Sequence, residues 1–160
     1  MIRLTDEQWE RIQNHFPEEH IPDGRPARRP IATRHVLEAE LWILNTGAHW
    51  HMLPQSYANY KTVHRRFQTW CRDEVLRRVL MDVANELRDR GALDEEDCFI
   101  DATFVIDRRR LSRYMRRWLV ERFFAWIQWQ HRILVRWEYH AQNFLGFVQL
   151  ACLIVLFRRF

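Results

Sequence analysis

Two acidic side chains in unusual surroundings are the residues of this sequence best placed to do chemistry. Asp101 is the single interior charge of a β-branched and aromatic stretch, residues 98–106, and that pattern predicts a strand. Glu121 is the one acid in the arginine-rich and apolar run Arg116–Trp126. A carboxylate in an apolar segment is costly unless it is exposed, paired or bound to metal. Both acids are therefore candidate metal ligands.

Glu121 shares one face of a predicted helix with three other polar side chains. Tyr114, Arg117, Glu121 and Gln128 follow one another at offsets that bring them to the same side. This arrangement fits a metal ligand, a buried ion pair, or a solvated Arg–Glu pair at i, i+4. A solvated pair contributes only about 0.3–0.5 kcal/mol and is common, so the spacing alone favours it.

Arginine makes up nearly all of the basic residues. The formal net charge is +4, and of the 25 basic residues only Lys61 is a lysine. Arginine is favoured where planar, bidentate contacts are made to phosphates or base edges. This composition indicates a nucleic-acid partner, with a solvated basic face as the alternative.

Three amphipathic segments predict a helical unit at the N-terminus. A capping box opens the first helix at Thr5, and the second spans residues 33–46 and ends at Gly47. Asn59 caps a third helix over residues 60–70. Three short helices of this kind predict a helix-turn-helix-like unit, and a small bundle with an ordinary polar face is the alternative.

The third of these helices has an apolar side and a basic, hydrogen-bonding side. A recognition helix needs both, because it is seated on supporting helices and reads the major groove with its outer face. The predicted DNA contacts on this helix are Lys61, His64, Arg65, Arg66 and Gln68.

A second basic element precedes the second helix. Residues 18–30 form a loop with three prolines and one glycine, and it carries Arg25, Arg28 and Arg29. An extended arm with arginines can lie in a minor groove, where the negative potential is strong. A plain solvated linker is the alternative for this segment.

The remaining sequence predicts a boundary and a second part. A fourth helix is expected over Asp73–Arg90, with Asp73 as its cap, and an acidic linker follows at residues 94–97. We therefore expect a helical DNA-binding domain over residues 1–92 and a separate part over residues 93–160.

The second part is expected to hold one strand and two long helices. After the strand at 98–106, the pattern predicts a helix over residues 108–137, a turn over 138–143 and a last helix over 144–159. The most apolar stretch, residues 144–157, is shorter than the about 20 residues that a membrane span needs. No membrane association is therefore expected.

Three widely spaced cysteines indicate the cellular compartment. Cys71, Cys98 and Cys152 form no CxxC pair, so they are interpreted as reduced thiols. The first residues show no apolar signal region. Together these features predict a cytoplasmic protein.

Six stretches of the sequence carry a resemblance to a known family. They are LTDEQWERI, LWILNTGAHWHMLP, YKTVHRRFQTW, FIDATFV, RRWLVERFFAWIQ and RWEYHAQNFLGFVQLACLIVL. Together they resemble bacterial insertion-sequence transposases of the DDE class, most nearly those of the insertion-sequence-five type. The resemblance implies an N-terminal DNA-binding helical domain followed by an RNase H-like catalytic domain. It also implies a phosphoryl transfer with Mg²⁺ or another divalent metal that cuts and rejoins transposon ends.

The resemblance assigns roles to single residues. Asp101 matches the first catalytic carboxylate of the family, and Glu121 matches the last, within the pattern Tyr-x2-Arg-x3-Glu-x6-Lys. Tyr114 and Arg117 are then DNA contacts, and Gln128 stands where the pattern has lysine. Only 19 residues separate the two acids, where the family carries further strands, helices and the second Asp. The second part therefore resembles a truncated RNase H-like remnant.

A missing second Asp weighs against catalysis. Two-metal phosphoryl transfer needs carboxylates that converge on two ions about 3.5–4 Å apart. We therefore expect a mainly α protein that binds double-stranded transposon-end DNA and is catalytically defective, and homodimerisation is compatible with this. One alternative is an active enzyme whose site is completed in trans by Asp94, Glu95 or Asp97 of another subunit. The other is a decayed product without a selected activity.

Overall fold

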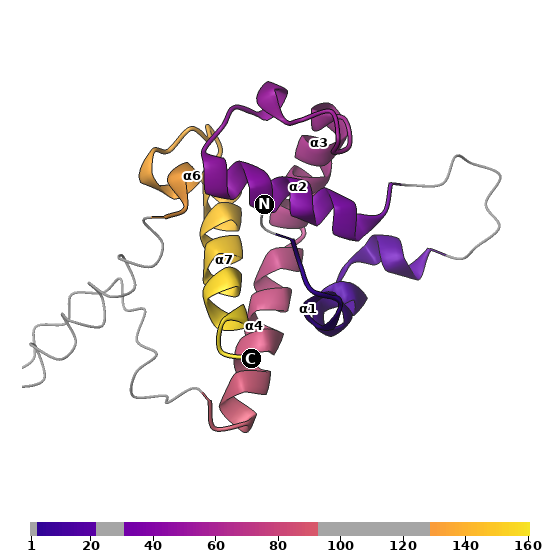
Figure 1. The fold of residues 1–160 in the computed structure, drawn as a ribbon, viewed down its shortest axis with the longest axis vertical. Coiled ribbons are helices and arrows are strands. Elements are labelled where there is room, and N and C mark those ends of the chain that lie inside the picture. Colours follow the sequence, from indigo (N-terminus) through magenta and orange to yellow (C-terminus); the bar gives the residue numbers. More distant parts are fainter. Residues whose placement is uncertain (1–2, 22–30, 93–128) are drawn as a thin grey trace, which may run out of the picture.

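The computed structural model describes residues 3–21, 31–92 and 129–160, and it shows a mainly helical protein (Figure 1). The predicted mainly α class is confirmed, and these ranges contain no strand. The strand predicted at residues 98–106 lies outside them, as do the helical residues expected before position 129.

The N-terminal helix begins with the predicted capping box. Helix α1 (Asp6–Ile12) starts after Thr5, whose hydroxyl accepts a hydrogen bond from the backbone N–H of Gln8 at 3.2 Å. The Gln8 side chain in turn accepts from the N–H of Thr5 at 3.0 Å. Two short 3-10 turns follow, η1 (Gln13–His15) and η2 (Pro17–His20).

The next two helices have the predicted starts, and α2 has the predicted end, whereas α3 runs two residues beyond the predicted residue 70. Helix α2 (Thr33–Thr46) ends at Gly47, and helix α3 (Tyr60–Arg72) begins at Asn59, whose side chain accepts from the N–H of Lys61. The residues between them contain one 3-10 turn, η3 (Trp50–Met52). Local signals were sufficient at Asn59 and Gly47 because each of these helix ends is satisfied by a residue beside it, whereas no side chain caps the start of α2.

The start of the fourth helix differs from the prediction. Helix α4 (Val75–Asp89) has Glu74 as its first cap residue, in the left-handed region with φ 53°, and Asp73 does not cap it. The Asp73 carboxylate instead accepts a hydrogen bond from Nε of Arg72 at 2.9 Å. An adjacent arginine thus competes successfully for the side chain that the sequence pattern assigned to the helix.

The C-terminal region corrects the predicted helix boundaries. Helix α6 covers only His131–Leu134 in the described residues, so the helix expected to run through residue 137 is wrong there. Helix α7 spans Ala141–Phe157, so the turn expected over residues 138–143 ends earlier than predicted. Arg132 and Glu138 are both buried and form an ion pair. Residues six apart point to different sides of a helix, so this pair requires the chain to leave the helical path.

Helix α7 lies alongside α4 and also contacts α3 and α2 (Figure 1). Its buried Phe147 and Leu150 belong to the same core as the side chains of the N-terminal helices. Gly146 permits this approach, because a Cβ there would lie 2.3 Å from Sγ of Cys71.

Among the described residues no helix is both long and apolar enough to cross a lipid bilayer. The domain boundary between residues 92 and 93 stays a prediction.

Gly47 is expected to tolerate no side chain. Both Gly47 and Gly91 have left-handed φ angles, +68° and +67°, so alanine at either position costs about 1–2 kcal/mol. At Gly47 the new Cβ would also lie 2.9 Å from Cβ of His131, whereas at Gly91 nothing lies within 4 Å. Gly47→Ala should therefore lower the free energy of unfolding by about 1–3 kcal/mol more than Gly91→Ala. Denaturant unfolding of the two variants tests this, and equal losses would contradict the packing of α6 on Gly47.

Candidate nucleic-acid interface

Helix α3 has a buried side and an exposed basic side. Val63, Phe67 and Trp70 are fully buried in the core. Lys61 and Arg65 are exposed, and neither side chain has a hydrogen bond or ion pair with any residue in the described ranges. The two residues are four positions apart, so they are neighbours on the helix surface. This surface is thus able to contact a phosphate backbone without first breaking internal bonds.

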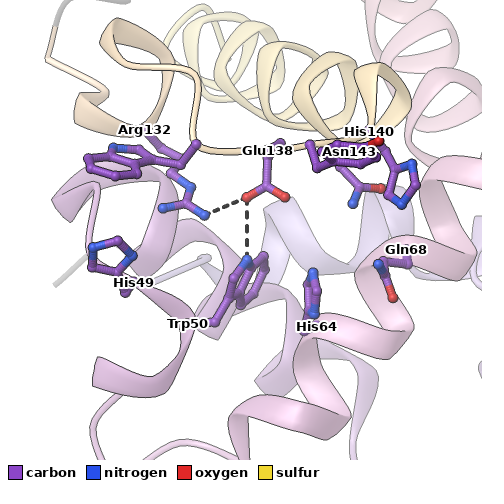
Figure 2. A pocket seen from close by; sticks show the side chains of 10 residues that line it. His49, Trp50, His64, Gln68, Arg132, Glu138, His140 and Asn143 are labelled. Atoms are coloured by element: carbon purple, nitrogen blue, oxygen red, sulfur yellow. Dashed lines mark hydrogen bonds and ion pairs between the residues drawn. The ribbon is translucent and has the colours of Figure 1, made fainter.

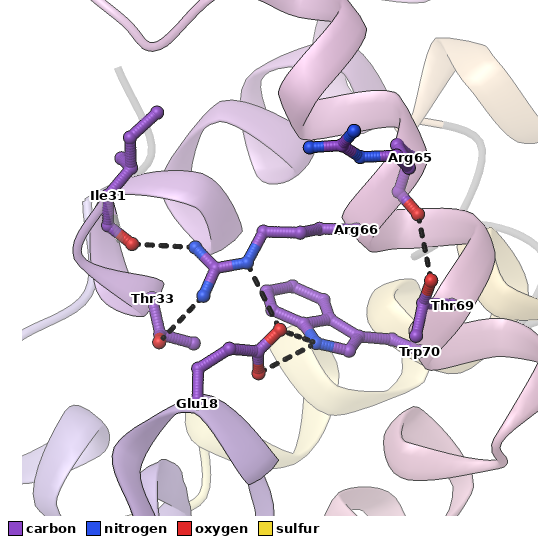
Figure 3. A network of polar contacts seen from close by, with 7 residues as sticks. All are labelled: Glu18, Ile31, Thr33, Arg65, Arg66, Thr69 and Trp70. Atoms are coloured by element: carbon purple, nitrogen blue, oxygen red, sulfur yellow. Dashed lines mark hydrogen bonds and ion pairs between the residues drawn. The ribbon is translucent and has the colours of Figure 1, made fainter. Parts of the chain in front are cut away.

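Arg66 occupies a different position from its neighbour Arg65 (Figure 3). Its guanidinium donates to the Glu18 carboxylate at 3.1 Å, to the carbonyl of Ile31 at 2.6 Å and to the hydroxyl of Thr33 at 3.5 Å. The Trp70 indole N–H donates to the same carboxylate at 3.1 Å. Only 12% of the Arg66 side chain is exposed, and its contacts join α3 to η2 and to the start of α2. Arg66 therefore orients the helix.

His64 and Gln68 lie at the edge of a pocket between α3 and the loop that joins α6 to α7 (Figure 2). The pocket has a volume of about 490 Å³. It is lined by aromatic rings, amides and one buried ion pair, and it adjoins the exposed basic side of α3. The lining residues are His49, Trp50, His64, Gln68, Arg132, Trp137, Glu138, Tyr139, His140 and Asn143.

The ion pair of Arg132 and Glu138 forms one wall of this pocket. The Glu138 carboxylate accepts from the Arg132 guanidinium and from the Trp50 indole N–H, the latter at 3.3 Å (Figure 2). Arg132 also donates to the carbonyls of Ala48 at 3.1 Å and Gly47 at 3.5 Å. These carbonyls follow the C-terminus of α2, where a cation is favoured by the helix dipole.

His64 lies against Trp50, in surroundings that disfavour its protonated form. Its centroid lies 4.6 Å from the Trp50 ring. Burial lowers the pKa of His64 below its ordinary 6.5, Glu138 acts in the opposite direction, and Arg132 lowers the pKa further. The imidazole of His64 and the amide of Gln68 both line the pocket and offer hydrogen-bonding groups to it.

The connection between α2 and α3 is long for a helix-turn-helix. Residues 47–59 join the two helices, whereas the turn of that motif holds about 3–4 residues. Trp50 belongs to this connection and packs against two rings of the core. Its ring centroid lies 5.6 Å from that of Phe67 and 5.8 Å from that of Phe147. The helix-turn-helix assignment and DNA contact by the residues of α3 stay predictions.

The other predicted site residues lie outside the described ranges. This applies to the predicted minor-groove arm, to the two candidate metal ligands and to the two candidate DNA contacts beside Glu121. Within the described ranges no group of three or more His, Cys, Asp or Glu is arranged to hold a metal ion. The residues outside the ranges are Arg25, Arg28, Arg29, Asp101, Tyr114, Arg117 and Glu121.

The pocket contains residues that the sequence patterns did not single out. These residues are Trp50, Arg132 and Glu138. Trp50 lies more than eighty positions before the other two in the sequence, so no periodicity links it to them. The one available signal was Glu138, the single acid among residues 129–160. Such an acid is typical of a buried pair, but the partner becomes identifiable only from the fold.

Comparisons with known proteins identify the family. Residues 4–80 match a family described as "Putative transposase of IS4/5 family (DUF4096)". A Sinorhizobium fredii protein described as "Uncharacterized protein y4sN" is 35% identical over 104 residues, which are 64% of this chain and 74% of that protein. No solved structure matches the chain. The matched family region contains α1, α2 and α3. The chain therefore belongs to this IS4/5 transposase family.

Proposed function

We propose that this protein binds double-stranded transposon-end DNA through the exposed side of α3. The observation that carries the proposal is the contrast between neighbouring basic residues on that helix. Arg66 is held by internal hydrogen bonds, whereas Lys61 and Arg65 are exposed without an internal partner in the described ranges. Free cations on a helix whose other side is fixed in the core are suited to phosphate and base-edge contacts.

The family supports DNA as the partner. In this proposal the exposed side of α3 enters a groove, and Arg66 keeps the helix in its orientation. An arm with Arg25, Arg28 and Arg29 adds minor-groove contacts. The protein acts on DNA in the bacterial cytoplasm, and a homodimer would bind the two inverted ends of an element symmetrically.

We further propose that the protein is catalytically defective. The support is the short spacing of Asp101 and Glu121, which leaves no room for the segment that carries the second Asp in DDE transposases. With one of three carboxylates missing, two metal ions cannot be held in the arrangement that strand cleavage needs. We expect no nicking of end DNA with Mg²⁺ or Mn²⁺, assayed on a supercoiled plasmid that carries the DNA flanking the coding region. Metal-dependent nicking that Asp101→Asn abolishes would contradict this.

The double variant Lys61→Ala/Arg65→Ala is expected to bind duplex DNA at least about tenfold more weakly than the wild type. If both side chains contact phosphates, the slope of log affinity against log salt should also fall by about two. Fluorescence anisotropy with two labelled duplexes measures both quantities. One duplex carries the DNA that flanks the coding region, and the other has the same composition in shuffled order.

A charge-matched control separates a specific contact from the loss of net charge. Arg77→Ala/Arg158→Ala removes two positive charges from exposed positions, one on α4 and one directly after α7, so it should leave the affinity within about twofold of the wild type. Arg66 is kept in both variants because its removal would disturb the orientation of α3. Equal losses of affinity in the two double variants would contradict the assignment of α3 as the recognition helix.

A further inference from the structure

The pocket beside α3 has the chemistry of a site for a nucleobase. Trp137 and Tyr139 stand at its edge with 54% and 90% of their surface exposed, which is unusual for rings of this size. His49 contacts the Trp137 ring edge-on, with 4.8 Å between the ring centroids, and so fixes one of these rings. Exposed, fixed aromatic rings are the platforms on which unpaired bases stack.

Polar groups inside the pocket match the edges of a base. The amides of Gln68 and Asn143 and the imidazole of His64 line it, and each offers hydrogen-bond donors or acceptors (Figure 2). One oxygen of Glu138 accepts from both Arg132 and Trp50, which leaves the other oxygen as an acceptor. Carboxylates and amides are the groups that recognise base amino and ring nitrogens. The volume of about 490 Å³ lies within the ordinary range of ligand pockets, about 300–1,000 Å³.

The position of the pocket indicates where the base comes from. Gln68 lies three positions after Arg65, and His64 lies three positions after Lys61, so the pocket wall and the basic side of α3 adjoin on one helix. A strand whose phosphates contact Lys61 and Arg65 would pass the mouth of the pocket. We propose that this pocket receives an unpaired base of the DNA that α3 binds, and this inference rests on the proposed DNA binding.

The test compares a blunt duplex with the same duplex carrying a single-stranded extension. The wild type is expected to bind the extended duplex about tenfold more tightly, because one base gains stacking on aromatic rings. Trp137→Ala and Tyr139→Ala should each lose most of this preference while keeping the affinity for the blunt duplex. Both side chains are largely exposed, so neither change removes core packing.

A matched control is available in the same region of the chain. Trp129 is 67% exposed and does not line the pocket, so Trp129→Ala should keep the preference for the extended duplex. Thermal melts by circular dichroism establish that all three variants are folded. A preference that is absent in the wild type, or that survives in both pocket variants, would overturn the inference.

The two proposals fail in different ways. If the Lys61→Ala/Arg65→Ala variant loses duplex affinity but the extension adds nothing, DNA binding stands and the base pocket does not. A labelled single-stranded oligonucleotide is measured in parallel, so that a protein without duplex affinity still gives an answer. The wild type and Trp129→Ala should bind this oligonucleotide, and Trp137→Ala should bind it about tenfold more weakly. Equal affinities for the three proteins, or no binding by any of them, would overturn the base pocket.

Discussion

Arg132→Met is expected to lower the free energy of unfolding by about 3–5 kcal/mol, because it leaves the buried Glu138 carboxylate without its cation. Only 3% of the Arg132 side chain and 7% of the Glu138 side chain are exposed. The guanidinium also donates to the carbonyls of Gly47 and Ala48, so its removal leaves acceptors at the end of α2 without a donor. Equilibrium unfolding in urea measures the loss.

A second substitution distinguishes the loss of the ion pair from the loss of packing. Glu138→Gln in the Arg132→Met background removes the buried charge and keeps an acceptor for the Trp50 indole, so it should recover part of the lost stability. Arg136→Met is the matched control, since Arg136 is exposed and its hydrogen bonds within the described ranges go to the carbonyls of Glu138 and Tyr139. A loss in Arg132→Met that is no larger than in Arg136→Met would refute the role of the pair.

Glu40→Met is expected to stabilise the protein. Glu40 lies on α2 with none of its surface exposed, and neither carboxyl oxygen has a hydrogen-bond partner among the residues that the structure describes. An unsatisfied buried polar group costs about 1–3 kcal/mol, and methionine has a similar length without polar atoms. The free energy of unfolding should therefore rise by about this amount at acidic pH, and by more as the pH increases.

The pH dependence follows from the direction of the pKa shift. Burial holds the pKa of Glu40 well above its ordinary 4.5; Arg66 acts to lower it and Glu18 to raise it. The folded state then binds a proton that the unfolded state releases above pH 4.5. The stability contributed by this proton is fully present below that pH and is lost as the pH rises towards the folded-state pKa. Over this window the free energy of unfolding of the wild type falls by up to about 1.4 kcal/mol per pH unit because of this proton. The variant lacks the carboxyl group and does not show this loss.

The measurement is the difference in unfolding free energy between Glu40→Met and the wild type, taken at several pH values from acid upwards. Subtraction removes the titration of groups that the two proteins share. Glu10→Met, which removes an exposed acid from α1, should show a difference that stays nearly constant with pH. A Glu40→Met difference that is flat above pH 4.5, or a variant less stable than the wild type, would refute the assignment of Glu40 as a buried, uncharged acid.

The helix starts at Thr5 and Asn59 and the stop at Gly47 were predictable because their signals are local. A capping side chain bonds a backbone group two or three residues away, and a left-handed glycine ends the helix beside it. The same local logic was wrong at Asp73, because Arg72 takes its carboxylate. It was also wrong for α6, because Arg132 and Glu138 pair in the core.

The residues of α3 show the same division within one helix. Helical periodicity predicts that Lys61 and Arg65 face outwards, and both are exposed. Periodicity places Arg66 about 100° further around the helix than Arg65, closer to the buried side, but it does not identify the groups that bond to it. The partners that hold Arg66, Glu18 and Ile31, lie 48 and 35 positions away in the sequence.

By itself the sequence determined the mainly helical class, the helix starts at Thr5 and Asn59, the stop at Gly47 and the basic side of α3, because each depends on residues within a few positions of one another. Only the tertiary structure decided that Arg66 supports the helix, that Glu40 is enclosed without a partner in the described ranges, and that Trp50 and Glu138 meet in one pocket. The physical reason is that burial and charge pairing are set by which distant surfaces pack together. Here α7 packs against α4, α3 and α2, and the spacing of residues along the chain does not encode that choice.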